Sequence, residues 1–197
     1  MKTLTYISTK DVNELTWPNT SDNTNLYSSA LTVFTDFATG GPRVIESNVR
    51  ADELVTLMRK EHVRMKLVVD SNNQFIGVIS LEDLSEDVFI RKVADGYQRS
   101  ELLVTDLMRS KETLLALSYN SLKNSDIESL LFSQRNNPYQ HLLVIDETTK
   151  AIRGLVSSND VARELRLDID VSFSSFQQIY TIALDEDKKA TQKLRVA

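Results

Sequence analysis

The sequence predicts an α+β fold in which two β-α-β-β-α repeats pack through their sheets as an intramolecular pseudo-two-fold pair. Residues 67–70 (LVVD) lead to residues 77–83 (GVISLED), and residues 143–146 (LVID) lead to residues 154–160 (GLVSSND). Each copy reads as an apolar strand, an acidic turn, a second strand beginning near glycine, and a helix start with the pattern Ser-x-x-Asp. An internal repeat of this kind indicates a duplicated structural unit. A unit of about 60 residues buries its sheet poorly when alone, so two copies stacked together are expected.

The repeat extends upstream of these segments. Residues 35–37 match residues 105–107 at an offset of 70, and residues 49–58 match residues 122–131 at an offset of 73. The offset grows to 76 at the acidic turns and to 77 at the Gly, Ser and Asp positions. Because loops tolerate insertions, we expect the extra residues in the polar turns, notably at 135–138 and 148–150.

Hydrophobic periodicity predicts the same elements in each repeat. For the first repeat they are a linker strand near 31–34, a strand at 44–45, a helix over 52–61, strands at 66–69 and 75–79, and a helix over 82–94. For the second repeat they are a strand at 114–117, a helix over 125–135, strands at 142–145 and 152–156, and a helix over 159–167.

These elements divide the chain into four parts. Residues 1–30 are polar and are expected to be a mobile N-terminal segment. Residues 31–100 and 101–167 are the two repeats. Residues 168–197 are expected to form a helical appendage, and its apolar stripe packs back on the domain or is buried in a dimer. The stripe consists of Val171, Phe173, Phe176, Ile179, Tyr180 and Ala183.

Composition excludes several classes of function. With no cysteine among its 197 residues, the chain has no disulfide, no thiol catalysis and no Cys-ligated metal site. The net charge of −5 and the scattered basic residues argue against nucleic-acid binding. No apolar run approaches the ~20 residues that cross a bilayer, so we expect no membrane contact and a cytoplasmic location. Two histidines are too few for a histidine-rich metal site.

The two Ser-x-x-Asp elements are the candidate binding sites. Ser80 and Ser157 stand where a strand gives way to a helix, whose free N–H groups and positive dipole end attract anions. Asp83 and Asp160 follow three residues later, where a carboxylate can accept both hydroxyls of a ribose. Ser-x-x-acid at a helix start is equally a capping arrangement. Capping and ligand binding are compatible, because the same N–H groups serve both.

The β-α-β-β-α order, the Gly-h-h-Ser-x-x-Asp ending and residues 105–108 (TDLM) resemble the tandem CBS domain pair, or Bateman module, over about residues 31–167. The resemblance implies a regulatory module that senses AMP, ADP, ATP or S-adenosylmethionine in a cleft between the repeats and signals to a separate, unidentified protein. It implies no required cofactor and a homodimer, and it looks like a stand-alone pair. The nucleotide-binding positions that it implies are Gly77, Ser80, Asp83, Gly154, Ser157 and Asp160.

Arg153 predicts that the two clefts differ. It directly precedes Gly154, whereas its counterpart before Gly77 is the apolar Ile76. An arginine there can face a phosphate, although a solvated strand cation is the simpler interpretation. We therefore expect at most one good nucleotide cleft, the second, with Arg153 among its residues.

Three functions remain as hypotheses. The first is a regulatory, ligand-sensing module, and the second is a protein-interaction or dimerisation module whose clefts are vestigial. The third, an enzyme, is disfavoured, because the sequence has no cysteine, P-loop, G-x-G-x-x-G or telling His-carboxylate pair. We expect no enzymatic activity and no catalytic residue.

Overall fold

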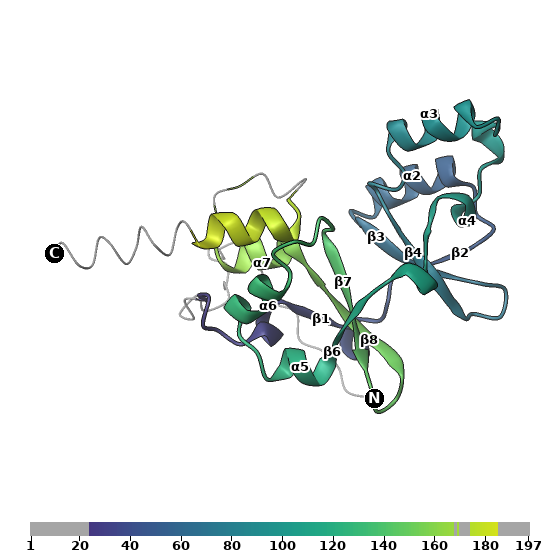
Figure 1. Ribbon diagram of the computed structural model, residues 1–197. Helices are drawn as coiled ribbons and strands as arrows, with labels where there is room; N and C mark the ends of the chain where they lie inside the picture. The colour runs from purple at the N-terminus through teal and green to yellow at the C-terminus, as the bar shows by residue number, and fades with distance from the viewer. Residues whose placement is uncertain (1–23, 168, 170–173, 185–197) are drawn as a thin grey trace, which may run out of the picture.

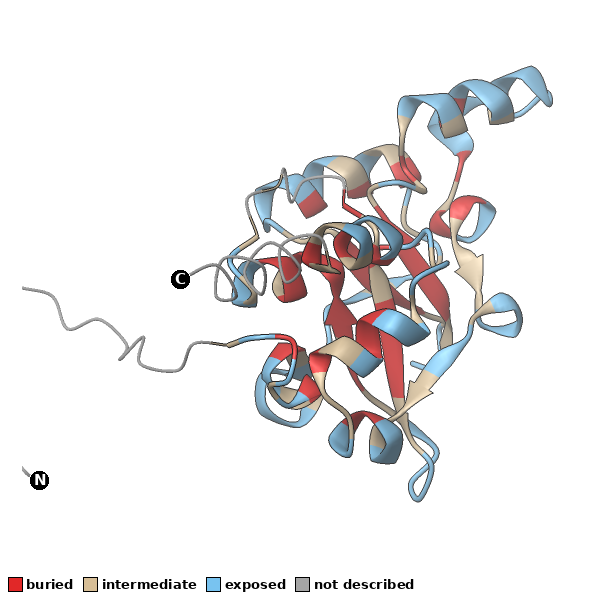
Figure 2. Ribbon diagram, turned by 60° about the vertical axis from the view of Figure 1, so that its left-hand side comes forward, coloured by how far each residue is buried: buried red, intermediate tan, exposed pale blue. Residues whose placement is uncertain are grey.

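The structure, a computed structural model, describes residues 24–167, 169 and 174–184 of the chain. It has two lobes, each a four-stranded sheet with its own helices (Figure 1). Buried residues follow the strands and the helix faces that turn toward them (Figure 2). The predicted α+β pair of repeats is confirmed.

Both sheets have the same pattern of strand pairing. In the first, the order is β2-β3-β4-β5, with β2 (Val44–Glu46) parallel to β3 (Met65–Val69) and the other pairs antiparallel. β4 (Phe75–Ser80) and β5 (Arg109–Ser110) complete this sheet. The second sheet has the order β1-β8-β7-β6, again with one parallel pair, β6 with β7. Its strands are β1 (Phe34–Asp36), β6 (Ala116–Ser118), β7 (His141–Asp146) and β8 (Ala151–Ser157).

The fourth strand of each sheet comes from the linker of the other repeat. β1 precedes the first repeat but pairs with β8 of the second, while β5 precedes the second repeat but pairs with β4 of the first. The helical turns beside these strands pack on the same lobe as the strands do. η1 (Ala30–Val33) packs in the core of the second lobe, and α4 (Val104–Leu107) packs in the core of the first. The two repeats are therefore tied together by exchanged linkers.

Helices cover each sheet. In the first lobe these are α2 (Ala51–Lys60) and α3 (Glu86–Ala94); in the second they are α5 (Tyr119–Lys123), α6 (Ile127–Ser133) and α7 (Ser158–Glu164). The linkers add the short turns α1 (Phe37–Gly40), η2 (Arg99–Glu101) and η3 (Lys111–Thr113).

The two sheets meet through a small apolar cluster of their own. Met65, Leu67 and Val78 from the first sheet are buried with Leu143 from the second. Along β3 the side chains alternate, so Val68 belongs to the helix-side core instead. Because β3 is buried on both faces, its sequence is a continuous apolar run with one lysine rather than an alternating pattern.

Strand pairing corrects the alignment of the two linkers. Asp36 pairs with Gly154 and Ser110 pairs with Gly77. Asp36 is therefore the counterpart of Ser110, and its match to Asp106 was wrong.

The position of the inserted residues also needs correction. The isolated bridges before the two helices make Arg50 the counterpart of Asp126, an offset of 76 rather than 73. The extra residues lie in α5, and their expected position at 135–138 was wrong. A shift of three residues keeps the apolar side chains on the same helix face, so periodicity could not reveal the error.

The helices after the Ser-x-x-Asp elements begin at different points. α7 begins directly after its N-cap Ser157, close to the predicted start. α3 begins only at Glu86, with Ser85 at the N-cap, whereas the prediction began at 82. In the first repeat the Ser-x-x-Asp residues form a separate turn before the helix.

Both ends of the described chain pack on the second lobe. Leu26 and Ala30, from the described part of the N-terminal segment, are buried in its core. Residues 176–184 are helical, and Phe176, Ile179 and Ala183 of the predicted stripe are buried in the same core. Residues 1–23, Val171 and Phe173 lie outside the described residues.

Gly77 and Gly154 make room for the exchanged strands. A Cβ on Gly154 would lie 2.1 Å from the Thr35 carbonyl oxygen, and one on Gly77 would lie 2.4 Å from the Arg109 carbonyl oxygen. Neither contact is with a flexible side-chain end, so the backbone itself would have to move. The structure thus assigns both glycines to close strand contact.

We expect Gly154→Ala to lower the free energy of unfolding by about 3 kcal/mol, at the upper end of the usual overpacking range, because β1 must move away from β8. Urea unfolding measures the change. Gly40→Ala is the matched control, since its Cβ would meet nothing within 4 Å. Equal effects of the two substitutions would contradict the assignment.

Candidate ligand clefts between the repeats

Ser80 and Asp83 close a turn at the end of β4. Asp83 Oδ2 accepts hydrogen bonds from the Ser80 hydroxyl at 2.7 Å and from the Ser80 backbone N–H at 2.8 Å. The Asp83 N–H donates back to Ser80 Oγ at 3.4 Å. This reciprocal pattern is that of a capping box, so these two side chains cap the turn.

An arginine from the exchanged linker covers this turn. Arg109 Nε lies 3.4 Å from Asp83 Oδ2, and both side chains are 18% exposed. The Arg109 guanidinium also stacks over the ring of Tyr139, at 4.3 Å from its centroid. Among the described residues, Arg109 Nε is a buried donor without a hydrogen-bond partner. A single strand exchange thus brings together groups from both repeats.

Two adjoining cavities border this cluster. The first, of about 600 Å³, is lined by Ser80, Glu82 and Arg64 of the first repeat together with Gln140 of the second. The second, of about 680 Å³, is lined by Arg109, whose guanidinium contacts Asp83 beside the first cavity. Cavities of this size suit a small-molecule ligand.

The second cavity has an apolar wall built by both repeats. Its apolar residues include Met65, Val78, Ala116, Leu117 and Leu143. Its polar rim includes Arg109, Tyr139 and His141. Tyr139 and His141 flank Gln140 of the first cavity, so one short segment contributes to both. An apolar wall beside a guanidinium can receive a flat base and an anion.

The charges around the cavities shift two pKa values. Burial raises the pKa of the Glu82 carboxyl, the neighbouring Asp83 raises it further, and Arg109 and Arg64 oppose the shift. Burial also lowers the pKa of the His141 imidazole to about 4, and the positive charges of Arg109 and Arg64 add to this effect. His141 is therefore neutral at pH 7, and the positive charge at the rim comes from the arginines.

The Ser157 and Asp160 cleft is built differently. Ser157 caps α7, and its hydroxyl oxygen accepts from the Asn159 N–H at 3.2 Å. Asp160 Oδ1 lies 3.3 Å from Nη1 of Arg163, and burial is the main cause that raises the pKa of its carboxyl. The Ser158 hydroxyl donates to the Ser174 carbonyl at 2.5 Å. The C-terminal segment therefore abuts the start of α7.

Neither described cavity lies at the cleft that the sequence favoured. Both are formed by described residues, and neither is lined by Gly154, Ser157 or Asp160. The buried amide oxygen of Asn159 has no hydrogen-bond partner among the described residues, so one polar group there is unsatisfied. Ligand binding at Ser157 and Asp160 stays a prediction.

Arg153 lies at a β-bulge, away from Ser157. Val144 pairs with Gly154 and Ile145 with Ile152, which leaves Arg153 unpaired in the ladder. It is four residues before Ser157, about 13 Å along an extended strand.

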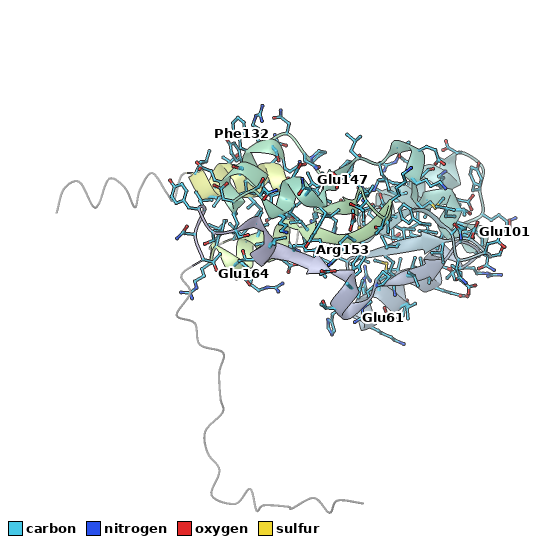
Figure 3. All side chains as sticks on the ribbon, turned by 90° about the horizontal axis from the view of Figure 1, so that it is seen from below. Glu61, Glu101, Phe132, Glu147, Arg153 and Glu164 are labelled. Carbon is cyan, nitrogen blue, oxygen red and sulfur yellow. The ribbon has the colours of Figure 1, made fainter. Side chains whose placement is uncertain are left out.

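The side chain of Arg153 is held by the exchanged linker. Its Nε and Nη2 donate to the two carboxylate oxygens of Asp36 at 2.9 and 2.8 Å, and it stacks over Tyr119 at 4.9 Å. Figure 3 labels Arg153 beside the ribbon of β1. The Arg153 guanidinium holds the pKa of the Asp36 carboxyl below its ordinary value. The structure brings Arg153 to the linker and does not bring it together with Asp160.

Sequence reasoning missed Arg109 and Tyr139. Arg109 lies in a two-residue strand in a polar stretch, and Tyr139 follows a proline in a loop. The counterpart of Arg109 in the first linker is Thr35, since Thr35 pairs with Leu155 as Arg109 pairs with Val78. That difference is visible in the sequence only once the linkers are aligned correctly.

The described residues include neither a metal-binding group nor a membrane-spanning helix. Within them, no group of three or more His, Cys, Asp or Glu side chains is placed to hold a metal ion. The helices of this part of the chain are too short or too polar to span a bilayer.

Comparisons with known proteins agree on the fold. Residues 35–89 match the model of the CBS domain. An uncharacterized conserved protein from Pyrococcus horikoshii has 16% sequence identity and a TM-score of 0.54, covering 74% of this chain and 98% of its own. A CBS-domain containing protein from Agrobacterium tumefaciens has 18% identity and a TM-score of 0.51, covering 71% and 98%. No curated protein matches the sequence.

A structure of CBSX2 from Arabidopsis thaliana in complex with AMP is more distant, with a TM-score of 0.49, 19% identity and coverage of 70% of this chain and 94% of its own. The match covers a CBS domain over residues 35–89 only. The two repeats together have the fold of a tandem CBS pair.

The low pKa of His141 predicts a pH-dependent stability. Its folded pKa of about 4 lies below the unfolded value of about 6.5, so the folded state binds fewer protons between these values. Stability is therefore full above pH 6.5 and falls as the pH drops toward 4, by at most about 1.4 kcal/mol per pH unit.

Urea unfolding of the wild type and of His141→Gln between pH 4 and 7 tests this dependence. We expect the difference in unfolding free energy between the two proteins to change with pH in that window. Parallel pH profiles would show that His141 is not the group responsible.

Proposed function

We propose that this chain is a regulatory module that binds an adenine nucleotide or adenosyl compound in a cleft between its CBS repeats and signals by conformational change to a separate partner protein. The observation that carries the proposal is the pair of adjoining cavities beside Ser80 and Asp83, lined by an apolar wall and by arginines. An arginine suits a phosphate, an aspartate suits a ribose, and the apolar wall suits a base. AMP, ADP, ATP and S-adenosylmethionine are the candidate ligands.

The geometry favours the Asp83 side, whereas the sequence pattern favoured Asp160. Asp83 is hydrogen bonded within its own turn and is contacted by the side chain of Arg109. We expect a ribose to reach this carboxylate once that arginine side chain moves aside. A non-catalytic role and a cytoplasmic location belong to the same proposal.

Calorimetry with AMP, ADP, ATP and S-adenosylmethionine tests this function. We expect saturable binding of at least one compound, with a higher thermal midpoint because the ligand stabilises only the folded state. Asp83→Asn keeps an oxygen that can accept from Ser80 but removes the charge, and Asp160→Asn is the matched variant in the other cleft. We expect Asp83→Asn to weaken binding about 10-fold or more, as for the loss of a charged hydrogen-bond partner.

The outcomes separate the two clefts. Loss of binding with Asp160→Asn alone would place the ligand at the second cleft, as the sequence favoured. Absence of heat with all four compounds on the wild-type protein would exclude the proposed function.

A protein-interaction or dimerisation module is the second candidate function. The outer helices of the first lobe carry exposed apolar side chains: Ile90 is 62%, Val93 48% and Leu57 38% exposed. Exposed apolar side chains on these two helices suit contact with a second copy of the chain.

Light scattering after size exclusion tests this alternative. A dimer that ignores nucleotides and dissociates in Ile90→Arg would support it. Tyr27→Arg, at an exposed apolar position of the other lobe, is the control and is expected to leave the dimer intact. A monomeric wild-type protein at micromolar concentration would exclude the dimerisation role.

A further inference from the structure

We propose that Arg109 is the residue that detects the anionic group of the ligand: a phosphate in the cleft draws its guanidinium away from Asp83, so that binding acts directly on the linker that joins the two repeats. This inference rests on the proposed function and adds the residue, the ligand chemistry and the route of the signal.

The contact between Arg109 and Asp83 is weak and therefore easily broken. Its Nε to Oδ2 distance of 3.4 Å exceeds that of a good charge-assisted hydrogen bond. Asp83 Oδ2 already accepts two shorter bonds from Ser80, so its charge stays stabilised when the arginine leaves. On moving to a phosphate, Arg109 would gain hydrogen bonds, whereas Asp83 would lose one long contact.

The unmet hydrogen-bonding capacity lies on Arg109. A guanidinium has five N–H donors in a planar fork that matches a phosphate bidentately. Here the buried Nε has no hydrogen-bond acceptor within the described residues, and the flat face rests on Tyr139. A phosphate oxygen at the rim of the second cavity would supply the missing acceptor.

The surroundings are suited to an anion. Arg64 lines the adjoining cavity, and both arginines act electrostatically on Glu82 and His141. Glu82 is the opposing charge. Since His141 is neutral, the cluster needs no protonation to hold a phosphate at pH 7.

Arg109 is also placed to pass the effect of ligand binding to the linker between the repeats. Its main chain is held against Gly77 and pairs with Val78 in β5, directly between α4 of the first lobe and η3 before the second repeat. The other linker has Thr35 at the corresponding place, so within the described residues the linker arginine belongs to the Asp83 cleft.

Titration of AMP and of adenosine by calorimetry tests the inference on the full chain. We expect the wild-type protein to bind AMP about 10- to 100-fold more tightly than adenosine, the range of one or two charged hydrogen bonds. In Arg109→Gln this preference should fall to about 1, because AMP loses far more affinity than adenosine does. Arg109→Lys should retain only part of it, because a lysine keeps the charge but not the fork.

Arg99→Gln is the matched control. Arg99 is paired with a carboxylate, Glu86, and stacks over a ring at 4.3 Å, as Arg109 does, but it lies on the surface. It should keep the preference of the wild type. Retained binding of adenosine shows that each variant is folded.

Each other outcome overturns the inference. If Arg109→Gln still prefers AMP, or if the wild type binds adenosine and AMP equally, Arg109 is not the anion sensor, although the adenosyl-binding function stands. Binding of S-adenosylmethionine without AMP would likewise exclude Arg109 as the sensor. If the wild type binds none of these compounds, the proposed function and this inference both fail.

Discussion

The exchange of linker strands is the constraint on which the rest of the structure depends. A short strand before each repeat completes the sheet of the other repeat, so neither sheet has all its strands without the other repeat's linker. The exchange requires main chains to pass close together, which is why glycine stands at 77 and 154. It also carries Arg109 and Asp36 into the neighbouring repeat, where each meets a charged partner.

That constraint makes the two clefts chemically unequal despite their shared fold. On one side Arg109 contacts Asp83 at the edge of two cavities. On the other, the corresponding linker residue is Thr35, and Asp160 is paired with Arg163 of its own helix. The C-terminal segment also packs against the start of α7. A duplicated unit can thus keep one architecture while its two sites diverge through a few linker residues.

Much of the fold could be predicted from the sequence, because apolar strands, glycines and Ser-x-x-Asp elements report local physics. The predicted strands lie close to β3, β4, β7 and β8. The alignment of the helices was wrong by about one turn, since that shift preserves the apolar face. The start of α3 was also placed too early, because a closed turn at Ser80 and Asp83 looks like a helix cap in sequence.

The sequence by itself determined that the chain is a duplicated α+β unit with paired Ser-x-x-Asp elements, because strand period and glycine spacing are local properties. Only the tertiary structure decided which groups meet. It placed Arg153 on Asp36 and brought Arg109 to Asp83. These contacts join residues far apart in the chain, and they depend on which sheet a two- or three-residue linker strand joins. Hydrogen bonding between strands decides which sheet such a strand joins. A segment of two or three residues is too short for its pattern of apolar and polar side chains to encode that pairing.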